Sequence, residues 1–285
     1  MKKLFLVLPF LFLLNVIFIP VAWGKKIDVF ELAENGTPKQ IREAINAGVN
    51  FNVSDEEFES ASERNETPLH VAAAFNHNPE VIRILIQQGL GVNDQAGYYK
   101  NSYTPLFNAI EYGNIEAVKE LLKHGADPFE VGTFTVSSFK EVIDLRDKNN
   151  SYATSKKLDD KTAKIIIEAL VNAGGNLDKQ WFSDDKTIKF LTYDKWEEYS
   201  NIEKDFLKRS TTALMFAVRA DDPFLVNLFL DLGADPTLKN LENKTALDYG
   251  VQLPYISKIK TSEIFEKLKS ATEFYNLRLK IKTKH

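Results

Sequence analysis

The chain has 285 residues, of which 44% are hydrophobic and 12% aromatic, with few Gly and Pro, as is typical of a folded protein. Its formal net charge of −4 becomes −6 without residues 1–24, which hold two lysines and no acid, so nucleic-acid binding by electrostatics is not expected. The absence of cysteine excludes disulfides, thiolate metal sites, a cysteine nucleophile and a lipid-anchored cysteine.

Residues 1–24 have the pattern of a secretory signal. Two lysines precede an apolar run from Leu4 to Val21, and the small residues Ala22 and Gly24 suit a signal peptidase. We expect cleavage and export to the periplasm or the medium, and the short signal on a cysteine-free chain favours a bacterial envelope. The alternative is an uncleaved anchor formed by residues 4–23, because the run is near the lower length limit of a membrane span.

Residues 28–47 are expected to form two short helices, Val29–Gly36 and Gln40–Ile45. The loop that follows, Val53 to Glu66, carries six acids against a single arginine, Arg64. Such a loop is interpreted as a solvated insertion, with a docking surface for a basic partner as the alternative.

The body of the chain contains an internal repeat. The stretch Thr67-Pro68-Leu69-His70-Val71-Ala72-Ala73-Ala74 recurs 37 residues later from Thr104, a third copy starts 108 residues further on at Thr212, and a fourth start follows at Thr245. A repeat of this length indicates a solenoid of stacked units.

The copy at Thr67 predicts two consecutive helices. Thr67 can cap the first, and Pro68 at the first helical position has a preset φ and no amide hydrogen. In the second helix, apolar residues at i, i+3 and i+4 form one buried stripe, and Gly89 ends the helix where a positive φ is favoured.

The pattern weakens between the second and third copies. Residues 142–145 are interpreted as the remains of a first helix and residues 163–172 as an amphipathic second helix, so a diverged unit is expected within 129–209. An insertion at 178–209 is dense in aromatic residues, which serve either as an internal core over the groove or as anchors for a partner. Residues 255–269 are expected to be helical and to end the array, followed by a basic, frayed C-terminal tail at 274–285.

The Thr-Pro-Leu-His-x-Ala start, read with the period, resembles the ankyrin repeat. The resemblance implies an all-α solenoid of antiparallel helix pairs, with about five or six units in residues 25–273 and residues 28–47 as the atypical first unit. Neither helix of a pair could bury its apolar face alone, so each pair depends on the next.

No residue pattern points to catalysis or to a cofactor. The four histidines do not have metal-binding spacing, and His70 is expected to hydrogen-bond neighbouring backbone and steady the turn. Asp184-Asp185 in the aromatic insertion is the nearest candidate for acid/base chemistry, but adjacent acids are common on solvated loops.

Recognition of a protein partner is therefore the leading hypothesis. In arrays of this family, partners lie across the finger loops and the first helices, and the resemblance carries those positions onto this chain. They are Glu63, Arg64, Glu66, Ala74, Phe75, Lys100, Asn101, Tyr103, Glu111, Tyr112, Arg219, Leu241, Glu242 and Lys244.

The chain is thus expected to be an exported, monomeric, non-catalytic binding module that meets a membrane only through an uncleaved N-terminal segment. Other interpretations are an accessory or protective factor for an envelope enzyme, a secreted effector that binds host proteins, and a hydrolase with a site in residues 129–209.

Overall fold

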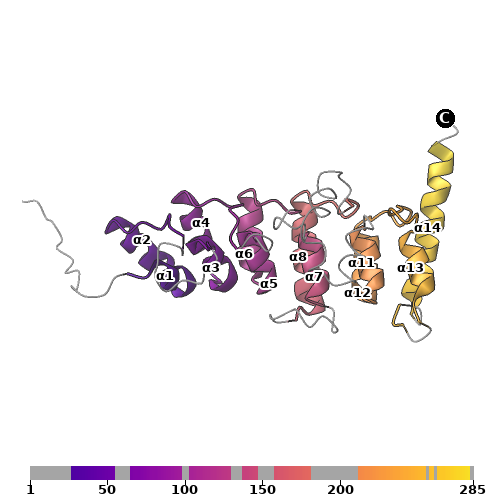
Figure 1. Cartoon of the computed structure of the whole chain (residues 1–285), viewed down its shortest axis with the longest axis horizontal. Helices are drawn as coiled ribbons and strands as arrows, with labels where there is room; N and C mark the ends of the chain where they lie inside the picture. Colours follow the sequence, from indigo (N-terminus) through magenta and orange to yellow (C-terminus); the bar gives the residue numbers. More distant parts are fainter. Residues whose placement is uncertain are drawn as a thin grey trace, which may run out of the picture.

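The computed structural model describes residues 27–54, 65–97, 103–129, 137–146, 157–180, 211–254, 257–259 and 262–282. These parts of the chain are helical except for connecting turns and one isolated β-bridge, as the all-α solenoid expected from the sequence requires (Figure 1). The signal segment lies outside the described residues, and no described helix has the length and apolarity to cross a bilayer.

The described helices form six consecutive pairs. Their bounds are α1 Val29–Asn35 and α2 Pro38–Asn46, α3 Pro68–Phe75 and α4 Pro79–Gln87, α5 Pro105–Glu111 and α6 Ile115–Lys123, α7 Ser138–Asp144 and α8 Asp160–Asn172, α11 Ala213–Arg219 and α12 Pro223–Asp231, α13 Ala246–Gln252 and α14 Glu263–Lys282.

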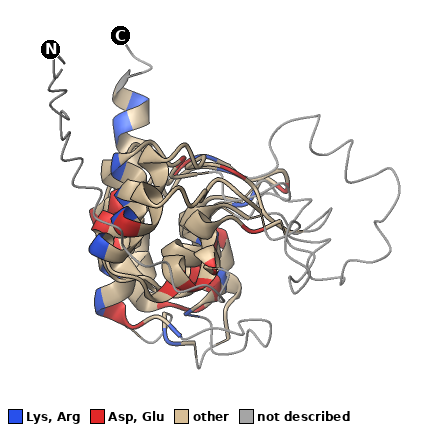
Figure 2. Cartoon of the chain, turned by 90° about the vertical axis from the view of Figure 1, so that its left-hand side faces the viewer, with Lys and Arg blue, Asp and Glu red and all other residues tan. Residues whose placement is uncertain are grey.

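The pairs stack into two layers. The first helices pack in the order α1, α3, α5, α7, α11 and α13, and the second helices α2, α4, α6 and α8 pack behind them, as do α12 and α14. Seen along the stack, connecting segments between units extend to one side of the helices (Figure 2). One apolar core runs through the described array, so each helix is stabilised by burial against the neighbouring unit.

The ends of the helices repeat from unit to unit. A threonine caps the first helix at Thr67, Thr104, Thr212 and Thr245. A glycine with φ between 87° and 96° follows the second helix at Gly48, Gly89, Gly125, Gly174 and Gly233. The prediction of positive φ at Gly89 is confirmed, and a residue with a Cβ is strained at each of these positions.

Buried asparagines link one unit to the next. The Asn76 side-chain amide donates to the carbonyls of Ala33 and Gly36, both at 3.0 Å. One unit later, the Asn114 amide donates to Ala73 and Asn76 at 3.0 and 2.9 Å. The same pair of hydrogen bonds therefore satisfies the carbonyls at the ends of α1 and α3.

The diverged unit has a longer first helix than the sequence pattern indicates. Helix α7 begins at Ser138 rather than Val142, because Ser137 replaces the missing threonine and accepts the amide of Phe139 at 3.1 Å.

At the C-terminus, residues 257–259 form a turn held by the Asp221 carboxylate, and α14 begins only at Glu263. It continues to Lys282, so most of the expected frayed tail is helical.

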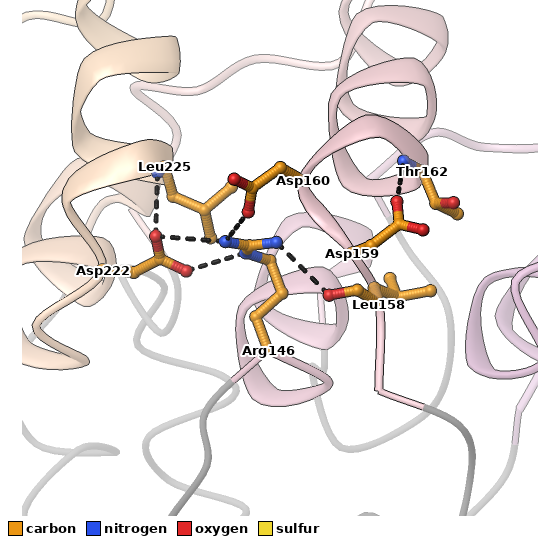
Figure 3. Close-up of polar contacts among 7 residues, drawn as sticks. All are labelled: Arg146, Leu158, Asp159, Asp160, Thr162, Asp222 and Leu225. Atoms are coloured by element: carbon orange, nitrogen blue, oxygen red, sulfur yellow. Dashed lines mark hydrogen bonds and ion pairs between the residues drawn. The ribbon is translucent and has the colours of Figure 1, made fainter.

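An arginine joins the two units on either side of residues 181–210 (Figure 3). Asp222 occupies the position that Asn114 has 108 residues earlier, but a carboxylate cannot donate to the preceding unit. Arg146, at the end of α7, supplies the donor: its Nε lies 2.7 Å from Asp222 Oδ2. Its terminal nitrogens contact Asp160 at 2.6 Å and the Leu158 carbonyl at 3.3 Å, which ties α7 to the starts of α8 and α12.

Candidate protein-binding surface

His70 holds the start of α3 and the base of the finger loop that connects α4 to α5. Its Nδ1 accepts the Thr67 amide at 3.3 Å, which leaves Nε2 protonated to donate to the carbonyls of Asp94 and Tyr103 at 3.1 and 3.3 Å. The ring is fully buried, and burial lowers the pKa of His70, so it is neutral at pH 7. The structural role predicted for His70 is confirmed.

The finger between the second and third units starts as a short antiparallel ladder. Ala96 and Tyr103 exchange both backbone hydrogen bonds, at 2.9 and 2.8 Å. The Tyr103 hydroxyl donates to Glu66 at 2.9 Å, and its ring packs against Phe107 with centroids 5.8 Å apart. The structure thus brings together two of the predicted site residues, Glu66 and Tyr103, and fixes the tyrosine before any partner arrives.

An exposed aromatic pair lies where α3 and α5 end. Phe75 and Tyr112 occupy equivalent positions in adjacent units, and their rings meet at 64° with centroids 4.6 Å apart. Each side chain is 43% exposed although it is large and apolar. Exposed aromatics in a fixed mutual geometry are typical anchors of protein interfaces.

A buried acid that the sequence interpretation did not single out lies beside this surface. Glu141, on α7, is 9% exposed, and no described hydrogen bond or ion pair holds its carboxyl group. Burial raises the pKa of Glu141 to about 8, and the carboxylates of Asp144 and Glu111 act in the same direction, while Lys140 opposes them. Lys140 is itself paired with Asp144. Glu111, a predicted site residue, therefore lies in an acidic neighbourhood that spans α5 and α7.

The other predicted residues gather around Tyr249 near the C-terminal end of the array. The cations of Arg219 and Lys244 lie 5.1 and 5.6 Å from the Tyr249 ring centroid, and Lys244 also pairs with Glu242 at 3.4 Å. The Asn240 amide donates to the Tyr249 hydroxyl at 2.7 Å. Leu241, at 62% exposure, projects from the same loop.

The predicted site residues that are described thus form two groups. Glu66, Ala74, Phe75, Tyr103, Glu111 and Tyr112 belong to the first, over α3 and α5, whereas Arg219, Leu241, Glu242 and Lys244 belong to the second, around Tyr249. Ala74 is buried and cannot contact a partner. Four predicted residues, Glu63, Arg64, Lys100 and Asn101, lie outside the described residues, as do Asp184-Asp185 and most of the aromatic insertion.

Neither of the two groups resembles a catalytic site. Within the described ranges, no three His, Asp or Glu side chains lie close enough to hold a metal ion. A shallow hollow of about 590 Å³ between α6 and α8 contains only Asp127 and Lys179 as charged groups, and the Lys179 ammonium lies 3.5 Å from the Phe129 ring centroid. Such a lining can hold a polar group but positions no nucleophile with a base.

The stacked helix pairs, the threonines that cap the first helices and the exposed aromatic pair at the ends of α3 and α5 define the class of helical-repeat binding proteins. Family models agree: one for three ankyrin repeats matches residues 29–130, and one for a single ankyrin repeat matches residues 210–241. An ankyrin repeat protein of Acanthamoeba polyphaga mimivirus is 30% identical over 141 residues, which are 45% of this chain and 78% of the viral protein. This chain belongs to the ankyrin repeat family, whose arrays are generally non-catalytic and bind proteins.

Two further comparisons show how much of each similar protein this chain covers. A human palmitoyltransferase is 27% identical over 79% of this chain, but the match spans only 33% of that enzyme, and most curated relatives are likewise covered by less than two thirds. An ankyrin repeat domain of Acinetobacter baumannii has the same fold, with a TM-score of 0.55 and 18% identity over 85% of this chain and 96% of that one.

Proposed function

We propose that this chain is an exported, non-catalytic module that binds a protein partner across α3, α5 and the finger that ends at Tyr103. The observation that carries the proposal is the Phe75–Tyr112 pair, because two large rings are exposed side by side on the face that ankyrin arrays use for binding. Glu66 and Tyr103 border the pair as a polar rim that is already ordered.

Export is the part of the proposal that rests on the sequence. Lys2, Lys3 and the apolar run from Leu4 to Val21 support a signal segment. The partner is then a protein of the cell envelope or of the surroundings.

Affinity capture from an envelope extract tests the binding surface. The chain from Lys25 to His285 serves as bait, and a Phe75→Ala, Tyr112→Ala variant serves as the surface mutant. Truncating both rings removes the central anchors, so we expect recovery of the main captured protein to fall at least about tenfold, as for interface hot spots. Quantitative mass spectrometry measures the recovery.

Two control variants test whether the loss of captured protein is specific to the Phe75–Tyr112 surface. Val251→Ala removes an exposed apolar side chain from α13 and is expected to leave the recovery unchanged. Tyr103→Phe keeps the ring but removes the hydroxyl that contacts Glu66, and is expected to weaken capture by only a few fold. Equal recovery by wild type and the Phe75, Tyr112 variant, with equal melting temperatures, would refute this surface.

A further inference from the structure

In the described part of the chain, the contacts that hold the last helix to the array come from the residues up to Tyr275. Phe265, Leu268 and Thr272 are buried on one side of α14, and the Lys267 ammonium contacts Asp231 on α12 at 2.5 Å. The Tyr275 hydroxyl donates to the Gly233 carbonyl at 3.1 Å. This part of α14 closes the end of the stack, as a terminal unit must.

The second half of α14 projects beyond the other helices (Figure 1). Every described side chain from Asn276 to Ile281 is exposed. Phe274, Leu277 and Ile281 follow one another at i, i+3 and i+7, which places them in one stripe on the side opposite Leu268. Their exposures are 61%, 59% and 55%, so water covers an apolar stripe that a terminal capping helix would normally lack.

Charge distinguishes this end of the chain from the rest. Residues 274–285 contain four basic residues and no acid, so with a net charge of −4 for the whole chain the first 273 residues carry −8. Arg278 follows Phe274 by four residues and Lys280 follows Leu277 by three, which places the two cations on opposite edges of the stripe. A basic helix end on an acidic body favours a negatively charged surface that also accepts apolar side chains.

We propose that the distal half of α14, residues 274–282, docks on an anionic lipid surface. The stripe inserts at the boundary of head groups and acyl chains, while the flanking Arg278 and Lys280 reach lipid phosphates. A second copy of the chain fits less well. Stable interfaces bury about 1,200–2,000 Å² in total, which three or four partly exposed side chains per copy cannot supply, and the basic residues of two copies would repel one another.

Vesicle flotation tests the proposal. The chain from Lys25 is used because it keeps every described helix and omits the apolar run at 4–21, which would bind lipid by itself. We expect flotation with vesicles of phosphatidylcholine and phosphatidylglycerol in equal amounts, and little with phosphatidylcholine alone. Replacing the stripe by Phe274→Gln, Leu277→Gln and Ile281→Gln is expected to weaken binding at least about tenfold.

Charge variants and a matched control complete the experiment. Arg278→Gln with Lys280→Gln is expected to weaken binding to the anionic vesicles by about 30-fold, and added salt is expected to have a similar effect. Val251→Gln, at a similarly exposed apolar residue on α13, should bind like wild type.

Two outcomes would overturn the proposal. The first is no flotation with anionic vesicles, or equal flotation by the stripe variant. The second is a dimer in sedimentation equilibrium without lipid that the stripe variant abolishes, which would assign the stripe to self-association. The melting temperature of each variant should match that of wild type, because these side chains are exposed.

Discussion

Glu141 shows how one buried residue can make the whole array sensitive to pH. In the unfolded chain its carboxyl titrates near 4.5, whereas in the fold its pKa is about 8. A raised pKa means that the folded state prefers the protonated form. The stability that Glu141 contributes is therefore fully present below pH 4.5 and is lost as the pH rises through 8.

We expect Glu141→Gln to remove this dependence. Gln has the size of the neutral acid, so the variant should match wild type near pH 5 and be more stable by roughly 3–5 kcal/mol at pH 9, since each pKa unit corresponds to about 1.4 kcal/mol. Urea unfolding at pH 5, 7 and 9 measures the difference. Glu116→Gln, at an exposed acid on α6, should follow the wild-type curve. Parallel pH profiles for wild type and Glu141→Gln would show that the carboxyl is ionised and satisfied in the fold.

At the scale of elements, the contact between the α7–α8 and α11–α12 pairs is distinctive. α7 packs on α11, but α8 and α12 hardly touch in the described part of the chain. Arg146 spans this junction through Asp222, and both side chains are nearly buried, at 10% and 14% exposure. The Phe224 ring lies 4.8 Å from the guanidinium and covers it.

Breaking this contact should cost more than removing a surface ion pair. Arg146→Met leaves Asp222 without its partner, and we expect a loss of about 2–4 kcal/mol in the free energy of unfolding. Asp222→Asn keeps an N-cap acceptor for the Leu225 amide, so its loss should come from the ion pair alone. A double-mutant cycle in urea isolates the coupling between the two residues. Additive losses would mean that the pair does not join the units.

How much of the molecule the sequence could predict depends on whether a feature is local. Pro68 and Gly89 act within their own helix pair, so their roles followed from spacing alone and are confirmed, as is the place of Thr67 at the N-cap of α3. The Phe75 and Tyr112 positions followed from the family, but their mutual contact needed the stack. Arg146 and Asp222 are 76 residues apart, and the diverged unit hides their relation, so no short pattern predicts the pair.

The bounds of the last helix were predicted less well, because they depend on contacts between units. The sequence placed the last helix at 255–269, whereas α14 runs from Glu263 to Lys282. The segment before it binds Asp221 through Ser257, Lys258 and Ile259, a contact with the preceding unit that no local propensity reveals. Tyr249, which organises the second group of site residues, sits at a position with no distinguishing pattern.

For the whole molecule, nearest-neighbour stacking predicts how the array loses structure. In the described part of the array, the main helix contacts join adjacent units, so a weakened junction should let the two sides open separately. In Arg146→Met we expect α11 to α13 to exchange amide hydrogens faster than α3 to α6, while wild type protects both. Hydrogen exchange followed by mass spectrometry measures this, and equal acceleration on both sides of the junction would contradict it.

The asparagine contacts have a consequence for how such a chain can change over generations. The Asn76 amide donates to the carbonyls of Ala33 and Gly36. The Asn114 amide donates to the equivalent carbonyls forty residues later in the chain, those of Ala73 and Asn76. A gene that loses or duplicates one whole unit here would bring an equivalent amide to an equivalent pair of carbonyls. The connection between units is interchangeable, so recombination can lengthen or shorten this part of the array without inventing a new contact.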